Sequence, residues 1–91
     1  MDIRVYFTPT CTWCAQLKTW MKKKRVPFEA IDIIESDTAR DEIIQKSGQL
    51  SVPLTEIDGE IIIGFDEAAL EKAIAKGKER DDKTYAEGRN K

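Results

Sequence analysis

The chain has 91 residues, of which 41% are hydrophobic and 35% are charged, and its formal net charge is -2. A chain of this length forms one domain around one core. The small net charge argues against general nucleic-acid binding, and no apolar run approaches the roughly 20 residues that cross a bilayer. The first residues lack the pattern of a secretory signal. We therefore expect a cytoplasmic protein without nucleic-acid or membrane partners.

A strand and a helix are predicted first, joined by a short loop. Residues 3–7 alternate in the period of a half-buried strand, and residues 8–10 form the loop. The helix begins at Cys11 or Thr12 and ends before Pro27, which cannot continue it. Its inward stripe consists of Cys14, Leu17 and Met21, with Trp20 beside them.

A second strand and a second helix follow. Residues 28–34 are nearly continuous in apolar character, which predicts an interior strand covered on both faces. The helical connection makes this strand parallel to the first. Ser36 or Asp37 is a good N-cap for the second helix, and Gly48 marks its end. The residues expected to face the core are Ala39, Ile43 and Ile44.

A hairpin and a third helix complete the predicted order β-α-β-α-β-β-α. Residues 54–57 and 60–63 flank Asp58-Gly59, a strong signal for a two-residue turn. Asp66 can cap a helix whose buried stripe consists of Leu70, Ala73 and Ile74. We expect an α/β fold in which a four-stranded mixed sheet is flanked by three helices. The domain spans residues 1–76, and the charged residues 77–91 form a frayed or disordered tail.

Cys11 and Cys14 are the only cysteines, and they lie where the first helix begins. Unpaired backbone N–H groups and the helix dipole stabilise a thiolate at Cys11. Cys14 lies one turn further on, where burial keeps it a neutral thiol at a distance that suits a disulfide. The pair can therefore reduce a substrate disulfide, with Cys11 attacking first and Cys14 resolving the mixed disulfide.

Other roles for a lone Cys-x-x-Cys pair are metal binding and inert burial. A structural zinc site needs four ligands, whereas this chain has two cysteines and no histidine. The absence of histidine also excludes Cys-His catalysis of the protease type. Two alternatives remain. One is a dimeric carrier of a [2Fe-2S] cluster that uses Cys11 from each chain, and the other is a redox-inactive interaction domain.

Cations are concentrated near the cysteines. Between Ile3 and Phe28 there is no acidic residue, and the cations are Arg4, Lys18, Lys22, Lys23, Lys24 and Arg25. Residues 22–25 lie in the last helical turn, where cations complement the helix dipole. Alternatively, a cationic face around the cysteines steers an acidic partner.

Several short segments together resemble the glutaredoxin branch of the thioredoxin fold over residues 2 to about 75. They are Thr8-Pro9-Thr10-Cys11-Thr12-Trp13-Cys14, Ser51-Val52-Pro53, Asp58-Gly59 and Gly64-Phe65-Asp66. The resemblance implies a dithiol-disulfide oxidoreductase with catalytic Cys11 and Cys14. It also implies a cis Val52-Pro53 peptide that packs against the cysteine pair and leaves the backbone of Val52 to a substrate. From the residues alone, Pro53 also fits a strand start that needs no N–H donor.

The resemblance further implies a substrate-binding surface around the cysteines. Its residues are Thr8, Thr10, Trp13, Ser51, Val52, Pro53, Gly64, Phe65 and Asp66. Trp13 stands where glutaredoxins usually carry Tyr and can pack on a bound peptide; the alternative is a helix-surface residue stacked near Trp20. Thr8 replaces a cation, and Phe65 replaces a glycine, of the sites that bind glutathione.

Gly64-Phe65 is also similar to the redoxins that serve ribonucleotide reductase and are recycled by thioredoxin reductase. The expected external reductant is therefore either glutathione or a thioredoxin-reductase-type protein. Protein disulfides, with ribonucleotide reductase as one candidate, are the expected substrates. We expect a monomer with no bound cofactor or metal.

Overall fold

The computed structural model describes the backbone of residues 1–90 and the side chains of residues 1–79. The strands are β1 (Ile3–Phe7), β2 (Glu29–Asp32), β3 (Leu54–Ile57) and β4 (Glu60–Ile63), and the helices are α1 (Thr12–Lys23), α2 (Asp37–Ser47) and α3 (Glu67–Asn90). The predicted order of elements is confirmed, and both strands of the hairpin begin and end at the predicted residues.

The four strands form one mixed sheet in the order β2-β1-β3-β4. β1 is parallel to β2 and antiparallel to β3, and β3 is antiparallel to β4. The prediction that residues 28–34 form an interior strand is wrong, because β2 is an edge strand. Its apolar run serves two separate cores: Phe28 packs on one face of the sheet, and Ile31 and Ile33 pack on the other. Ile34 is 61% exposed.

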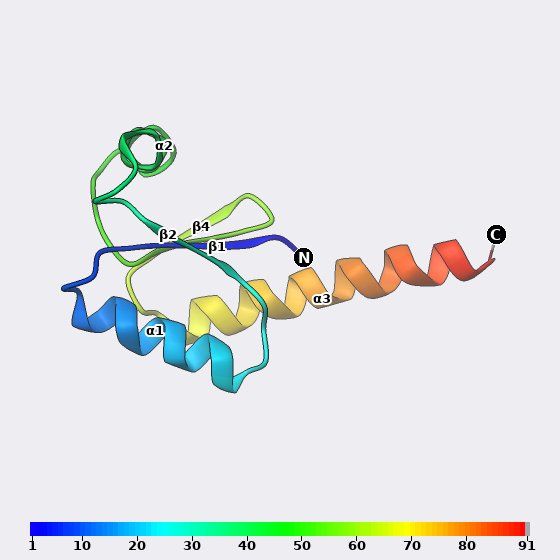
Figure 1. Ribbon diagram of the computed structural model, residues 1–91. Helices are drawn as coiled ribbons and strands as arrows, with labels where there is room; N and C mark the ends of the chain where they lie inside the picture. Colours follow the sequence, from blue (N-terminus) through cyan, green and yellow to red (C-terminus); the bar gives the residue numbers. More distant parts are fainter. Residues whose placement is uncertain (91) are drawn as a thin grey trace.

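The molecule has three layers, with α2 on one face of the sheet and α1 and α3 on the other (Figure 1). β1 alternates between the two cores, since Ile3 and Val5 face α1 and α3 whereas Tyr6 faces α2. The buried stripe of α2 contains Ala39 and Ile43, as predicted. Ile44 does not belong to it and is 47% exposed, because one residue turns a helix by about 100° away from the buried stripe.

The ends of α2 follow the predicted capping signals. Ser36 is the N-cap, and its Oγ accepts a hydrogen bond of 3.1 Å from the backbone N–H of Ala39. Gly48 adopts the left-handed conformation at φ 77°, and its N–H donates to the carbonyl of Ile44 at 2.8 Å. Glycine suits this position because it has no Cβ to clash there.

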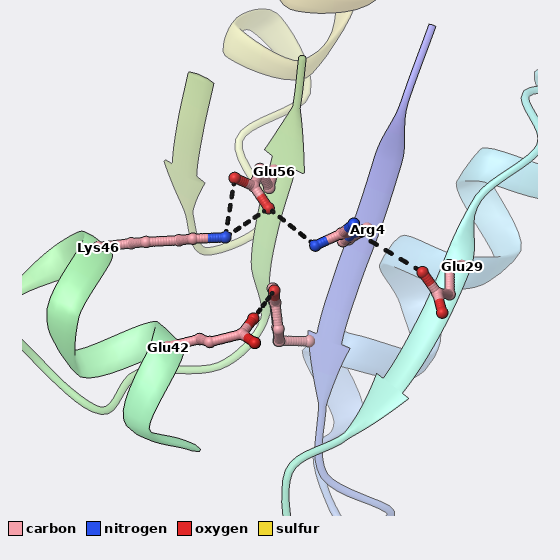
Figure 2. Close-up of polar contacts among 6 residues, drawn as sticks. Arg4, Glu29, Glu42, Lys46 and Glu56 are labelled. Atoms are coloured by element: carbon pink, nitrogen blue, oxygen red, sulfur yellow. Dashed lines mark hydrogen bonds and ion pairs between the residues drawn. The ribbon is translucent and has the colours of Figure 1, made fainter. Parts of the chain in front are cut away.

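A ladder of ion pairs crosses the sheet beneath α2 (Figure 2). Arg4 lies in register with Glu29 on β2 and Glu56 on β3. Arg4 Nε is 3.7 Å from Glu29 Oε1, and Lys46 Nζ of α2 is 2.9 Å from Glu56 Oε1. Pairs near the surface contribute roughly 0–1 kcal/mol each, so the ladder orients α2 more than it stabilises the fold.

The third helix is longer than predicted. We expect residues 77–91 to form a frayed or disordered tail; α3 continues through this segment to Asn90 and extends past the end of the sheet (Figure 1), and Lys91 lies outside the described residues. The physical reason is composition: apart from two glycines, this segment is rich in strong helix formers such as Lys, Glu, Arg and Ala. The predicted stripe of Leu70, Ala73 and Ile74 is buried. No helix in the described part of the chain has the length and apolar character to span a membrane.

Replacing Tyr6 by Phe should lower the free energy of unfolding by about 1 kcal/mol, because the fully buried Tyr6 hydroxyl donates to Glu42 Oε2 at 3.1 Å. Burial raises the pKa of Tyr6, and the hydrogen bond with Glu42 adds to this effect. The native protein therefore keeps this stabilisation below pH 10 and loses it as the pH rises further. Urea unfolding of both proteins at pH 7 and above pH 10 tests this, since a gap that fails to narrow at high pH would contradict it.

Candidate active site

Cys11 is the N-cap of α1, so the helix begins where the sequence predicted. Its backbone is extended, with φ -85° and ψ 112°, and its Sγ accepts a hydrogen bond of 3.1 Å from the backbone N–H of Cys14. The N–H of Cys11 donates to the carbonyl of Thr8 at 3.2 Å, which fixes the loop before the helix. Cys11 is only partly exposed. Its sulfur thus occupies the place of a capping oxygen, with a backbone donor aimed at it.

Cys14 lies on the inward stripe of α1 and is fully buried. Burial raises the pKa of the Cys14 thiol to about 12, and a hydrogen bond with Cys11 contributes to the rise. The backbone N–H of Thr8 and the charge of Lys18 act in the opposite direction on the same pKa. The two thiols are therefore chemically distinct: an accessible one at the helix start, and a covered one that keeps its proton at neutral pH.

The register of the sheet brings three loops to the same end of the strands, where Cys11 lies. Tyr6 pairs with Leu54, and Leu54 pairs with Ile63. The residues that follow β1, precede β3 and follow β4 therefore lie side by side (Figure 1). The last two loops are joined directly, because the N–H of Gly64 donates to the carbonyl of Pro53 at 2.8 Å. The Val52-Pro53 peptide is cis, as the resemblance implied.

The predicted substrate-binding residues differ in how far they are exposed. Pro53 is buried; the half-buried members are Thr8, Ser51, Val52, Gly64 and Phe65, and the exposed ones are Thr10, Trp13 and Asp66. Asp66 already serves as a helix cap, since its Oδ1 accepts from the N–H of Ala69 at 3.2 Å. Trp13 is 61% exposed, next to Cys11. A role in substrate binding stays a prediction for all nine residues.

Phe65 faces α1. Its ring meets that of Trp20 edge to face, with centroids 6.0 Å apart and an interplanar angle of 70°. The residue that packs against Trp20 is therefore Phe65, and not Trp13 as one alternative supposed. Sequence reasoning gave Trp20 no role, because no local pattern predicts a contact between residues 45 positions apart.

Lys18 is one of the cations that the sequence placed near the cysteines, but its contact in the fold was not predicted. It follows Cys14 by four positions on α1, which places the two side chains on neighbouring turns of one face. Its Nζ lies 3.7 Å from the centroid of the Phe7 ring, in a cation–π contact. The i, i+4 spacing was the available signal. The contact with Phe7 holds a positive charge near the buried thiol.

The glutaredoxin family model matches residues 3–62. The chain belongs to the glutaredoxin family. It is 39% identical over 74 residues to a glutaredoxin-like 8.6 kDa protein in the rubredoxin operon of Clostridium pasteurianum, covering 81% of this chain and 99% of that protein. It is 32% identical over 66 residues to Glutaredoxin 3 of Escherichia coli, covering 72% and 80% of the two chains. The crystal structure of a thioredoxin-like protein has a TM-score of 0.74 and 30% identity, covering 79% and 99%.

Membership of the glutaredoxin family confirms the thioredoxin fold and supports a function of the thiol-disulfide oxidoreductase type. Glutaredoxins are thiol-disulfide oxidoreductases that carry no prosthetic group and use glutathione or other external reductants. The matched segment contains the Cys-x-x-Cys pair and the cis proline, and it ends one residue before the end of β4. Gly64, Phe65 and Asp66 lie beyond it.

Cys14 should resist alkylation until the pH approaches 12. A Cys11→Ser variant isolates this thiol: the hydrogen bond with Cys11 is lost there, but burial, the larger cause, still holds the Cys14 pKa above that of an ordinary cysteine near 9. Because the thiolate is the disfavoured form, the rate of reaction with iodoacetamide should climb throughout the range from pH 8 to 11. Mass spectrometry measures this rate, with the same variant unfolded in urea as control. A plateau near pH 9 in the folded variant would contradict it.

Proposed function

We propose that this glutaredoxin is a dithiol-disulfide oxidoreductase that reduces disulfides of proteins or small molecules through a mixed-disulfide intermediate. The observation that supports this most directly is the difference between the two sulfurs. Cys11 Sγ is at the helix start with the Cys14 N–H at 3.1 Å, whereas the Cys14 side chain is covered by the core. One sulfur can meet a substrate, and the other can react only with its neighbour.

In the first step, the Cys11 thiolate attacks one sulfur of the substrate disulfide. The substrate S–S bond breaks, a Cys11–substrate S–S bond forms, and the departing thiolate takes a proton from water. In the second step, Cys14 loses its proton to water and attacks Cys11 Sγ. The second substrate thiolate leaves, and the protein holds a Cys11–Cys14 disulfide. The substrate has gained two electrons, which the external reductant later replaces.

The surroundings of Cys14 suit this order of events. In the reduced protein, burial and the hydrogen bond with Cys11 keep Cys14 protonated by raising its pKa. Once Cys11 is part of a mixed disulfide, its sulfur carries no charge, so this second cause disappears. The Thr8 N–H and the Lys18 charge, which lower the Cys14 pKa, remain. Deprotonation of Cys14 thus becomes easier only after the first step.

The external reductant in this proposal is a thioredoxin-reductase-type protein, with glutathione as the slower donor. Thr8 offers no charge to a glutathione carboxylate. Phe65 is engaged with Trp20, in the loop where a glycine would leave the backbone open. The proposed substrates are protein disulfides, and ribonucleotide reductase remains one candidate. Exposed Trp13 is the side chain best placed to contact them.

Replacing Cys11 and replacing Cys14 should have different effects on the reaction. Cys11→Ser should abolish reduction of hydroxyethyl disulfide, because the attacking sulfur is gone. Cys14→Ser should accumulate a mixed disulfide at Cys11, because nothing resolves it. Mass spectrometry of the protein after one turnover distinguishes these states. Full activity in the Cys11→Ser variant would disprove the proposed mechanism.

Restoring a cation at position 8 should raise kcat/KM with glutathione. For Thr8→Lys we expect an increase of about two- to fivefold at low salt, the range of one exposed ion pair. The matched control is Thr38→Lys, which adds the same charge at an exposed position on α2. Native protein and both variants are assayed with glutathione plus its reductase and with NADPH plus thioredoxin reductase. Native protein that turns over faster with glutathione would show that the choice of reductant is wrong.

A further inference from the structure

A groove of about 410 Å³ lies between α1 and the start of α3. One wall is a stripe of α1 from Thr12 to Lys23, and the other contains Phe65 and Glu67. Trp20 and Phe65, which meet edge to face, contribute its aromatic lining. The volume falls in the range of about 300–1,000 Å³ typical of ligand pockets. The groove shares Phe65 with the predicted substrate-binding surface, but none of residues 51–53 lines it.

The groove begins at the active site and continues along the helix. Thr12 lies between the two cysteines, so the near end of the groove adjoins Cys11. Beyond Trp20 a second hollow of about 240 Å³ follows the same α1–α3 seam. Lys24 spans this seam: its Nζ is 5.3 Å from the centroid of the Trp20 ring and 2.7 Å from Glu71 Oε1. α1 and α3 lie on the same face of the sheet (Figure 1).

The far end of the groove carries unpaired positive charge. Lys23 is the cation of the lining, and Lys22 and Arg25 are its exposed neighbours in the sequence, outside the lining itself. Within the described side chains none of the three takes part in an ion pair. Glu67 is the acidic residue of the lining and stands on the opposite wall. An occupant that extends along α1 therefore meets an apolar stretch first and a cationic end second.

We infer that this groove docks an acidic segment of a redox-partner protein, with an apolar side chain against Trp20 and Phe65 and carboxylates beside Lys22 and Lys23. The inference rests on the proposed function, because it supplies the partner of the same cysteine pair. When the disulfide of a partner protein lies at Cys11, the neighbouring segment of that protein can enter the groove beside Thr12 without any change in the fold. Charge complementarity selects an acidic segment over a basic one and speeds its encounter with the groove.

The test uses two synthetic peptide disulfides that differ only in one arm. In the acidic peptide, the segment next to the disulfide contains a leucine flanked by four aspartates. In the basic peptide, the same segment contains a leucine flanked by four lysines. Reduction by the protein, recycled with dithiothreitol, gives kcat/KM for each peptide. We expect native protein to favour the acidic arm by about fivefold or more at low salt, the effect of two or three exposed charge pairs. The preference should shrink in about 0.5 M salt, roughly three times the physiological ionic strength, because the charges are then screened.

Matched variants locate the effect. Lys22→Glu/Lys23→Glu should abolish the preference, whereas Lys72→Glu/Lys76→Glu, with the same change in net charge at exposed positions of α3, should keep it. Thr19→Tyr should lower kcat/KM for the acidic peptide several-fold, because Thr19 is exposed and a larger side chain there fills the groove. Loss of the preference in both charge variants would assign it to long-range charge and overturn the inference.

Reduction of hydroxyethyl disulfide, which has no arm, separates this inference from the proposed function. If native protein does not reduce it, the proposed function fails. If native protein reduces it but treats the two peptides equally, only the docking inference fails. A single-stranded DNA oligonucleotide that competes with the acidic peptide and removes the preference would also overturn the inference, since the site would then be a general cationic patch.

Discussion

The packing of α1 against the sheet is the constraint on which the chemistry of this protein depends. Leu17 and Met21 fix the rotation of the helix about its axis, and this rotation turns Cys14 into the core. Cys11, less than one turn earlier, is then left at the N-cap, where its sulfur accepts a backbone hydrogen bond. One hydrophobic stripe therefore creates an accessible sulfur and a protected one from two identical side chains. A helix rotated by one residue, about 100°, would take Cys14 off the buried stripe.

The sheet contributes the second half of the site. Because β1 and β3 are antiparallel and β3 and β4 form a hairpin, the chain passes the same end of the strands three times. Two loops that follow the cysteines by about 40 to 50 residues in the sequence are thus brought beside them by the strand pairing alone. The hydrogen bond from Gly64 to Pro53 ties two of them into one unit. The family relationship agrees with this arrangement, since the matched segment reaches from β1 into β4.

Local signals predicted local structure well, and long-range contacts account for the differences. The Asp58-Gly59 turn and the Ser36 cap depend on neighbouring residues, so the sequence was enough to place them. The edge position of β2 depends on strand order, which an apolar run does not reveal. The pairing of Trp20 with Phe65 joins α1 to the loop before α3 and had no sequence signal. In the site, the placement of the cysteines was predictable from their spacing at the start of a helix, and the cis proline was predictable because the resemblance implied it.

The two indoles of this protein sit in different surroundings, and this has an optical consequence. Trp13 is exposed and lies between the cysteines, whereas Trp20 is partly buried, with Phe65 at its edge and Lys24 above it. An indole in water emits at longer wavelength than one in an apolar contact, and a nearby disulfide quenches it. The red edge of the emission spectrum would therefore follow the redox state of the cysteines, while the blue edge would report on the α1–α3 seam. The molecule carries separate fluorescent reporters for its chemistry and for its surface.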